Sequence, residues 1–169
     1  MTNKEEGALV SRLAELARNH DRIIATAESC TGGLIAAAFT DLSGSSEWFD
    51  RGFVTYSNEA KQQMLGVRQE TLLHHGAVSE ATVLEMAQGA LQQSNASLAV
   101  SVSGVAGPTG GSAEKPVGTV WIACASAAKK SKSVAQHHLF AGDRQQVRER
   151  AVEKAIDLLI QCIESDSSD

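Results

Sequence analysis

The chain has 169 residues, of which 43% are hydrophobic and 21% are charged, so it is long enough for one domain with a substantial core. Its net charge of −5 argues against a general nucleic-acid-binding protein. No apolar run is long enough to cross a bilayer, and residues 1–6 lack the apolar stretch of a signal peptide. We therefore expect a single cytoplasmic domain over residues 1–169, with no membrane or nucleic-acid partner.

Helical periodicity predicts a first helix at 5–19, a second after Gly32-Gly33 that ends near Asp41, a short helix at 58–65, one more short turn at 69–75 and a helix at 79–93. A last helix follows its N-cap Asp143, with Gln146 at the capping-box position. Apolar, β-prone runs predict strands at 22–27, 51–56, 97–103, 117–125 and 132–140, with a hairpin turn at Lys129-Lys130. Helices separate the first three strands, and a hairpin follows. This order predicts a three-layer α/β/α domain with a mixed, mostly parallel five-stranded sheet.

The segment 26–33, Thr-Ala-Glu-Ser-Cys-Thr-Gly-Gly, joins the first predicted strand to the second predicted helix. Free N–H groups from Cys30 to Gly33, at a helix start, suit an anion or a developing oxyanion. Ser29 is placed where a nucleophile would be useful, with Thr31, Gly32 and Gly33 as substrate contacts. The alternative is a helix-capping serine followed by glycines that serve packing.

Lys61 is the candidate base for Ser29, because it follows the end of the second predicted strand by one helical turn. Loops after parallel strands meet at one edge of a sheet, where a partly desolvated lysine loses its proton more easily. Glu28 and Glu59 are close in sequence and would oppose that shift. The alternatives are a solvated surface lysine and, for the nucleophile, Cys30, whose thiol we interpret as a packing group.

A glycine-rich loop at 104–116 follows the third predicted strand, and Gly104, Gly107 and Gly110 favour an anion-binding turn rather than a merely flexible loop. Arg144, at the start of the last helix, supplies a positive charge for a phosphate unless it is simply exposed.

The three widely spaced cysteines fit neither a disulfide framework nor a zinc site. The histidines are interpreted as structural or solvated, so we expect no metal; they are His20, His74, His75, His137 and His138.

At these residues the sequence closely resembles the CinA C-terminal domain family, whose characterised members are nicotinamide mononucleotide (NMN) deamidases. The matching segments are 26–33, 44–46, 51–61, 76–79, 103–111, 115–119 and 142–144, in order and at family-like spacing. The set is much more specific than any single motif, and it implies the stand-alone form of the domain.

The resemblance implies hydrolysis of the NMN carboxamide to nicotinate mononucleotide and ammonia, without a cofactor. It assigns the nucleophile to Ser29 and the base to Lys61, and it implies further site residues at Ser46, Tyr56, Ser103 and Arg144. We also expect a homo-oligomer, with a dimer as the simplest form. Two alternatives stay open, a nucleotide- or partner-binding module without turnover and an amidase with the same dyad but a different small substrate.

Overall fold

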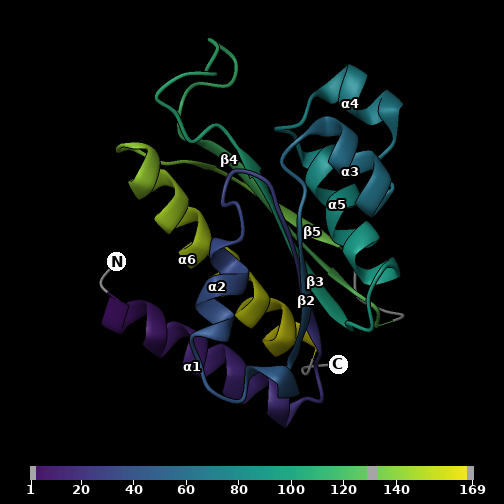
Figure 1. The fold of residues 1–169 in the computed structure, drawn as a ribbon, viewed down its shortest axis with the longest axis vertical. Coiled ribbons are helices and arrows are strands. Elements are labelled where there is room, and N and C mark those ends of the chain that lie inside the picture. The colour runs from purple at the N-terminus through teal and green to yellow at the C-terminus, as the bar shows by residue number, and fades with distance from the viewer. Residues whose placement is uncertain (1–2, 129–132, 167–169) are drawn as a thin grey trace.

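A computed structural model describes residues 3–128 and 133–166 as one sheet covered by helices on both faces (Figure 1). The strands are β1 (Ile24–Glu28), β2 (Phe49–Val54), β3 (Leu98–Gly104), β4 (Thr119–Ser126) and β5 (Val134–Leu139). The helices are α1 (Asn3–Asn19), α2 (Leu34–Thr40), η1 (a 3-10 helix, Ser45–Glu47), α3 (Asn58–Leu65), α4 (Gln69–His75), α5 (Glu80–Gln92) and α6 (Arg144–Asp166).

The strands lie in the order β2-β1-β3-β4-β5. β1 pairs in parallel with both β2 and β3, whereas β4 is antiparallel to both of its neighbours, β3 and β5. Four strands therefore point the same way and β4 runs against them, which confirms the predicted mixed, mostly parallel sheet. The predicted turn at Lys129-Lys130 between β4 and β5 lies outside the described residues.

The two faces of the sheet carry side chains of different size, as the alternation along β3 illustrates. Leu98, Val100 and Val102 pack into a large core with α1, α2 and α6, and Figure 1 shows these helices together on one face. Ala99 points the other way and packs with Met86 of α5, on the face that α3 and α4 also cover. Small side chains on this second face let α5 lie close to the sheet.

The same close approach positions α3. Gly89 of α5 lies so near the backbone of Leu65, the last residue of α3, that a Cβ atom there would overlap the Leu65 carbonyl. Ser57 caps the other end of α3, where its hydroxyl accepts a hydrogen bond from the N–H of Ala60. Both ends of α3 are thus fixed, which matters because α3 carries Lys61.

The last helix begins with the predicted capping box. The side chain of Asp143 accepts a hydrogen bond from the N–H of Gln146, and the side chain of Gln146 accepts one from the N–H of Asp143. Two details differ from the sequence-based prediction. β2 begins at Phe49 rather than at 51, because η1 ends just before it, and the N-cap of α2 is Gly33 rather than Ser29.

Candidate active site

Ser29 and Lys61 meet where β1 and β2 end. Ser29 follows the last residue of β1, and Lys61 lies in the first turns of α3, just beyond β2. The Nζ atom of Lys61 is 3.0 Å from the Oγ atom of Ser29 and 2.8 Å from the carbonyl oxygen of Thr55. The structure therefore brings together the two residues that sequence reasoning paired, within hydrogen-bonding distance.

Lys61 is only 1% exposed, and this burial determines its charge state. Taking an ammonium group out of water favours the neutral amine, so burial lowers the pKa of Lys61 from 10.5 to about 8. Among the described residues no carboxylate forms an ion pair with Lys61. Glu59 is exposed and accepts a hydrogen bond from Gln63 instead.

Glu28 is fully buried next to the dyad, but its carboxylate faces the start of α2. It accepts hydrogen bonds from the N–H groups of Gly33, Ile35 and Ala36, and from the hydroxyl of Thr26. These N–H groups belong to the first turn of α2, where an anion is favoured by the helix dipole. An internal carboxylate, rather than a substrate, thus occupies the helix start that the sequence suggested as an anion site.

The turn between β1 and α2 leaves two N–H groups free. The N–H of Gly32 donates to the carbonyl of Ser29 at 3.0 Å, and the N–H of Gly33 donates to Glu28. In the described parts of the chain, no other residue accepts a hydrogen bond from the N–H groups of Cys30 and Thr31, although the N–H of Cys30 also faces its own thiol. The oxyanion donors expected from Cys30 to Gly33 are therefore reduced to these two, because the other two close the turn.

Cys30 lies beside the nucleophile but is only 6% exposed. Burial raises the pKa of its thiol to about 11, so the thiol carries its proton at neutral pH. The hydroxyls of Thr31 and Thr55 are also buried, and neither has a hydrogen-bond partner among the described residues. Both hydroxyl oxygens are enclosed by the protein, so neither faces the solvent side of the dyad.

Arg144 connects two segments at the same edge of the sheet. Its guanidinium donates to the carbonyl of Gly107 at 2.8 Å and to the hydroxyl of Tyr56 at 3.0 Å. Tyr56 follows β2 closely and is 63% exposed, and Gly107 belongs to the glycine-rich loop, which extends past the upper edge of the sheet in Figure 1. Sequence reasoning placed all three residues at one site, and the structure brings them together.

Ser103 and Gly104 end β3 at this edge, next to Ser29, whose N–H donates to the carbonyl of Val102. The Ser103 hydroxyl is buried and donates to the carbonyl of Ala77 at 2.7 Å, so it fixes the segment between α4 and α5. Gly110 is exposed farther along the loop, and no hydrogen bond within the described ranges joins it to the dyad.

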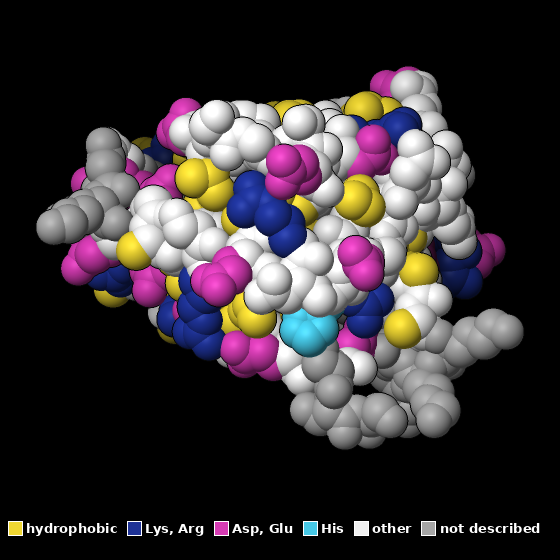
Figure 2. Space-filling view, turned by 90° about the horizontal axis from the view of Figure 1, so that it is seen from below, with side chains coloured by type: hydrophobic (Ala, Val, Ile, Leu, Met, Phe, Trp, Pro, Cys, Tyr) yellow, Lys and Arg dark blue, Asp and Glu magenta, His cyan; other side chains and the backbone are white. Residues whose placement is uncertain are grey.

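Ser46 lies elsewhere. It belongs to η1, just before β2, and the first residue of β2, Phe49, pairs with the first residue of β1, Ile24. Ser46 is therefore at the opposite end of β1 from Ser29. Figure 2 views the molecule from below Figure 1, and acidic and basic side chains are interspersed on that face. Within this chain the structure does not bring Ser46 to the dyad, and its role stays a prediction.

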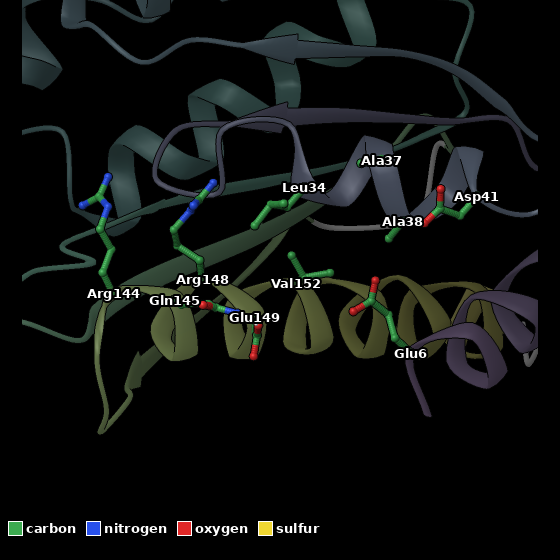
Figure 3. Close-up of a pocket in the computed structure, with 10 residues that line it drawn as sticks. All are labelled: Glu6, Leu34, Ala37, Ala38, Asp41, Arg144, Gln145, Arg148, Glu149 and Val152. Atoms are coloured by element: carbon green, nitrogen blue, oxygen red, sulfur yellow. Dashed lines mark hydrogen bonds between the residues drawn. The ribbon is translucent and has the colours of Figure 1, made fainter. Parts of the chain in front are cut away.

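A groove of about 530 Å³ runs between α1, α2 and α6 (Figure 3). Its floor is apolar, with Leu34 and Val152, and Arg144 and Arg148 stand at the end nearest the turn after β1. Arg148 donates from Nε to the carbonyl of Cys30 at 3.1 Å and from Nη2 to the carbonyl of Thr31 at 3.0 Å. The groove therefore lies behind the turn of residues 29–33 that joins β1 to α2, which we call the Ser29 turn. Arg148 lies between the groove and this turn.

Two participants in the site were missed by sequence reasoning: Thr55, whose carbonyl accepts from Lys61, and Arg148, which binds the Ser29 turn. Glu28 was expected near the dyad, but its role at the start of α2 was not. Arg148 lies one helical turn after Arg144, and this four-residue spacing on one helix face was the signal that could have identified it. The directions of the Glu28 side chain and of the Thr55 carbonyl depend on how β1 and β2 pair and end, which the sequence does not specify.

The described residues contain no cluster of three or more His, Cys, Asp and Glu side chains that could hold a metal ion. The expected absence of a metal stays a prediction. None of the described helices is both long and apolar enough to span a membrane.

Comparisons with known proteins show the family of this chain. Residues 6–163 match the family model of the CinA C-terminal domain. The chain is 53% identical over 161 residues to the nicotinamide-nucleotide amidohydrolase PncC of Escherichia coli K12, covering 95% of this chain and 96% of that protein. It is 45% identical over 168 residues to a CinA-like protein of Syntrophobacter fumaroxidans, covering 99% of this chain and 39% of that longer protein.

Solved structures give the same result for the fold. The crystal structure of a competence/damage inducible protein from Agrobacterium tumefaciens superposes with a TM-score of 0.89, at 44% identity, covering 96% of each chain. Sequence and fold both match over nearly the whole chain, so the chain belongs to the CinA C-terminal domain family.

Proposed function

We propose that this protein hydrolyses the carboxamide of NMN to nicotinate mononucleotide and ammonia, using Ser29 as nucleophile and Lys61 as base. The observation that carries the proposal is the buried Ser29–Lys61 pair, with 3.0 Å between Oγ and Nζ and no carboxylate bound to the lysine within the described residues. The 53% identity to an amidohydrolase named for nicotinamide nucleotides supports the substrate.

In the proposed reaction the neutral amine of Lys61 takes the proton of the Ser29 hydroxyl, and Oγ attacks the carboxamide carbon. The carbonyl oxygen becomes an oxyanion, which the free N–H groups of Cys30 and Thr31 are placed to receive. The protonated lysine returns its proton to the departing ammonia as the tetrahedral intermediate collapses. Water then attacks the acyl-Ser29 ester, with Lys61 again as base, and frees the carboxylate product.

The direct test measures ammonia release by the purified protein from NMN, from nicotinamide riboside and from nicotinamide. We expect turnover of NMN to be the most efficient, and to persist after dialysis against a chelator, because the described residues offer no metal-binding cluster. Activity that disappears with the chelator and returns with a divalent ion would contradict the dyad mechanism. An absence of ammonia from NMN would instead favour a binding module.

Arg144 is our candidate ligand for the 5′-phosphate, because it uses two of its five N–H donors on Gly107 and Tyr56, and no other described residue takes the remaining three. We expect Arg144→Ala to raise KM for NMN by roughly 10- to 100-fold and to change kcat much less, since a charged hydrogen bond is lost in both ground and transition states. Steady-state kinetics on NMN and on nicotinamide riboside provide the measurement.

Nicotinamide riboside lacks the phosphate, so its KM should differ little between wild type and Arg144→Ala. Arg150→Ala is the matched control, because Arg150 lies on the same helix and, among the described residues, binds the carbonyl of Ala141 alone. If Arg144→Ala raises KM equally for both substrates, the phosphate binds elsewhere and Arg144 supports the arrangement of the loops. The expected homodimer, its cytoplasmic location and the single-domain organisation stay predictions.

A further inference from the structure

Arg148 is the side chain that holds the outer side of the Ser29 turn. It extends from α6 towards the start of α2, as Figure 3 shows, and its guanidinium contacts two successive carbonyls, those of Cys30 and Thr31, at 3.1 and 3.0 Å. It also packs over Gly32, where an added Cβ would lie 3.5 Å from Nη2. One charged group thus fixes two consecutive peptide groups next to the nucleophile.

The first of these peptide groups carries a free oxyanion donor. In a planar trans peptide the C=O and the following N–H point in opposite directions. The carbonyl of Cys30 faces Arg148, so the N–H of Thr31 in the same peptide points away from α6. That N–H is one of the two that donate to no other residue in the described parts of the chain.

The second peptide group orients the other donor. The carbonyl of Thr31 faces Arg148, and the N–H of Gly32 in that peptide donates to the carbonyl of Ser29. The Ser29 carbonyl shares its own peptide group with the N–H of Cys30, which is the second free donor. Arg148 therefore acts on both free N–H groups, on one directly and on the other through the hydrogen bond between Gly32 and Ser29.

We infer that Arg148 is a positioning residue, which aims the N–H groups of Cys30 and Thr31 at the developing oxyanion and polarises them. A cation bound to a carbonyl draws electron density from the peptide and strengthens its N–H as a donor, because hydrogen bonds in a chain reinforce one another. This inference rests on the proposed attack by Ser29. It gives Arg148 a role different from that of Arg144, whose guanidinium faces Tyr56 and the glycine-rich loop.

The kinetic test compares Arg148→Met, which keeps length and loses the donors, with Arg148→Lys, which keeps the charge. Direct loss of an oxyanion donor lowers kcat by about 10²- to 10³-fold, so loss of a residue that only aims the donors should lower it by roughly 10- to 100-fold. KM should stay within about threefold, and the lysine variant should regain part of the loss. Arg150→Met, two residues after Arg148 on the same helix, is the control and should match wild type.

A second readout keeps this inference separate from the choice of substrate. A fluorophosphonate reacts with an activated serine and places its phosphoryl oxygen where the oxyanion would lie, so its rate of labelling Ser29 reports the same donors without NMN. We expect labelling to slow in Arg148→Met by a factor similar to that in kcat. The pH midpoint of labelling should not move, because Lys61 is untouched.

The outcomes are distinct. If wild type is labelled at Ser29 but does not hydrolyse NMN, the proposed substrate is wrong, and the labelling rates alone decide the role of Arg148. Equal labelling of wild type and Arg148→Met, or a raised KM with unchanged kcat, would overturn the positioning role; the second result would make Arg148 a substrate ligand. A wild type that neither hydrolyses NMN nor is labelled would remove both proposals.

Discussion

Ser29→Ala should lower kcat for NMN by at least about 10³-fold, whereas Cys30→Ala should keep most of the activity. The alanine variant has no nucleophile, and the neighbouring thiol cannot replace it. Cys30 is buried, and its pKa of about 11 leaves almost no thiolate at neutral pH. The two adjacent residues thus form a matched pair, in which one change removes the reacting atom and the other removes a packing group.

Mass spectrometry of the enzyme, quenched during turnover, adds a direct measurement to the kinetics. An acyl group should be found on the peptide that contains Ser29 and should be missing from Ser29→Ala. Both variants should keep the far-ultraviolet circular dichroism of wild type, because each loses only one small side-chain atom. If Cys30→Ala is inactive while Ser29→Ala retains turnover, the enzyme is a cysteine hydrolase and the dyad assignment is wrong.

Lys61→Arg should be nearly as damaging as Lys61→Ala, with kcat/KM reduced by about 10³-fold or more in both. A guanidinium keeps the positive charge but cannot release its proton at working pH, so it cannot serve as base. Lys154→Arg is the matched control, because Lys154 lies on α6 and pairs with Asp157. Near-normal turnover in Lys61→Arg would show that only positive charge is needed, and the base would then be sought first among the histidines.

The pH dependence of wild type tests the same assignment. Burial lowers the pKa of Lys61 to about 8, so the reactive neutral amine is about a tenth of the total at pH 7 and predominates above pH 9. We therefore expect kcat/KM to rise about tenfold per unit on the acidic side of pH 8 and to level off above it. A profile that is flat between pH 6 and pH 9 would contradict a lysine base.

The order of elements and the Ser29–Lys61 pair were predictable from sequence, because both follow from local rules. Apolar runs marked the strands, a capping box marked the start of α6, and the ends of parallel strands placed Ser29 and Lys61 at one edge. Arg144 was predictable as a site residue from its position at the start of the last helix and from the family resemblance.

Hydrogen-bond assignments inside the site were not predictable, because they depend on which way individual peptide groups turn. Four N–H groups from Cys30 to Gly33 look equivalent in the sequence, yet Gly32 closes the turn and Gly33 binds Glu28. The resemblance likewise implied Ser46 without saying that the pairing of Phe49 with Ile24 carries it to the far end of β1. Both results are set by tertiary geometry rather than by residue type.

The burial that makes Lys61 a base also works against the folded state. An unfolded lysine titrates near 10.5 and the folded one near 8, a difference of roughly 3 kcal/mol at about 1.4 kcal/mol per unit. Below pH 8 both states hold the proton, and folding must desolvate a cation. Between about pH 8 and 10.5 the unfolded state binds more protons than the folded state, so this penalty fades as the pH rises. At neutral pH, the fold is therefore less stable than its packing alone would make it, and the site's reactivity is the reason.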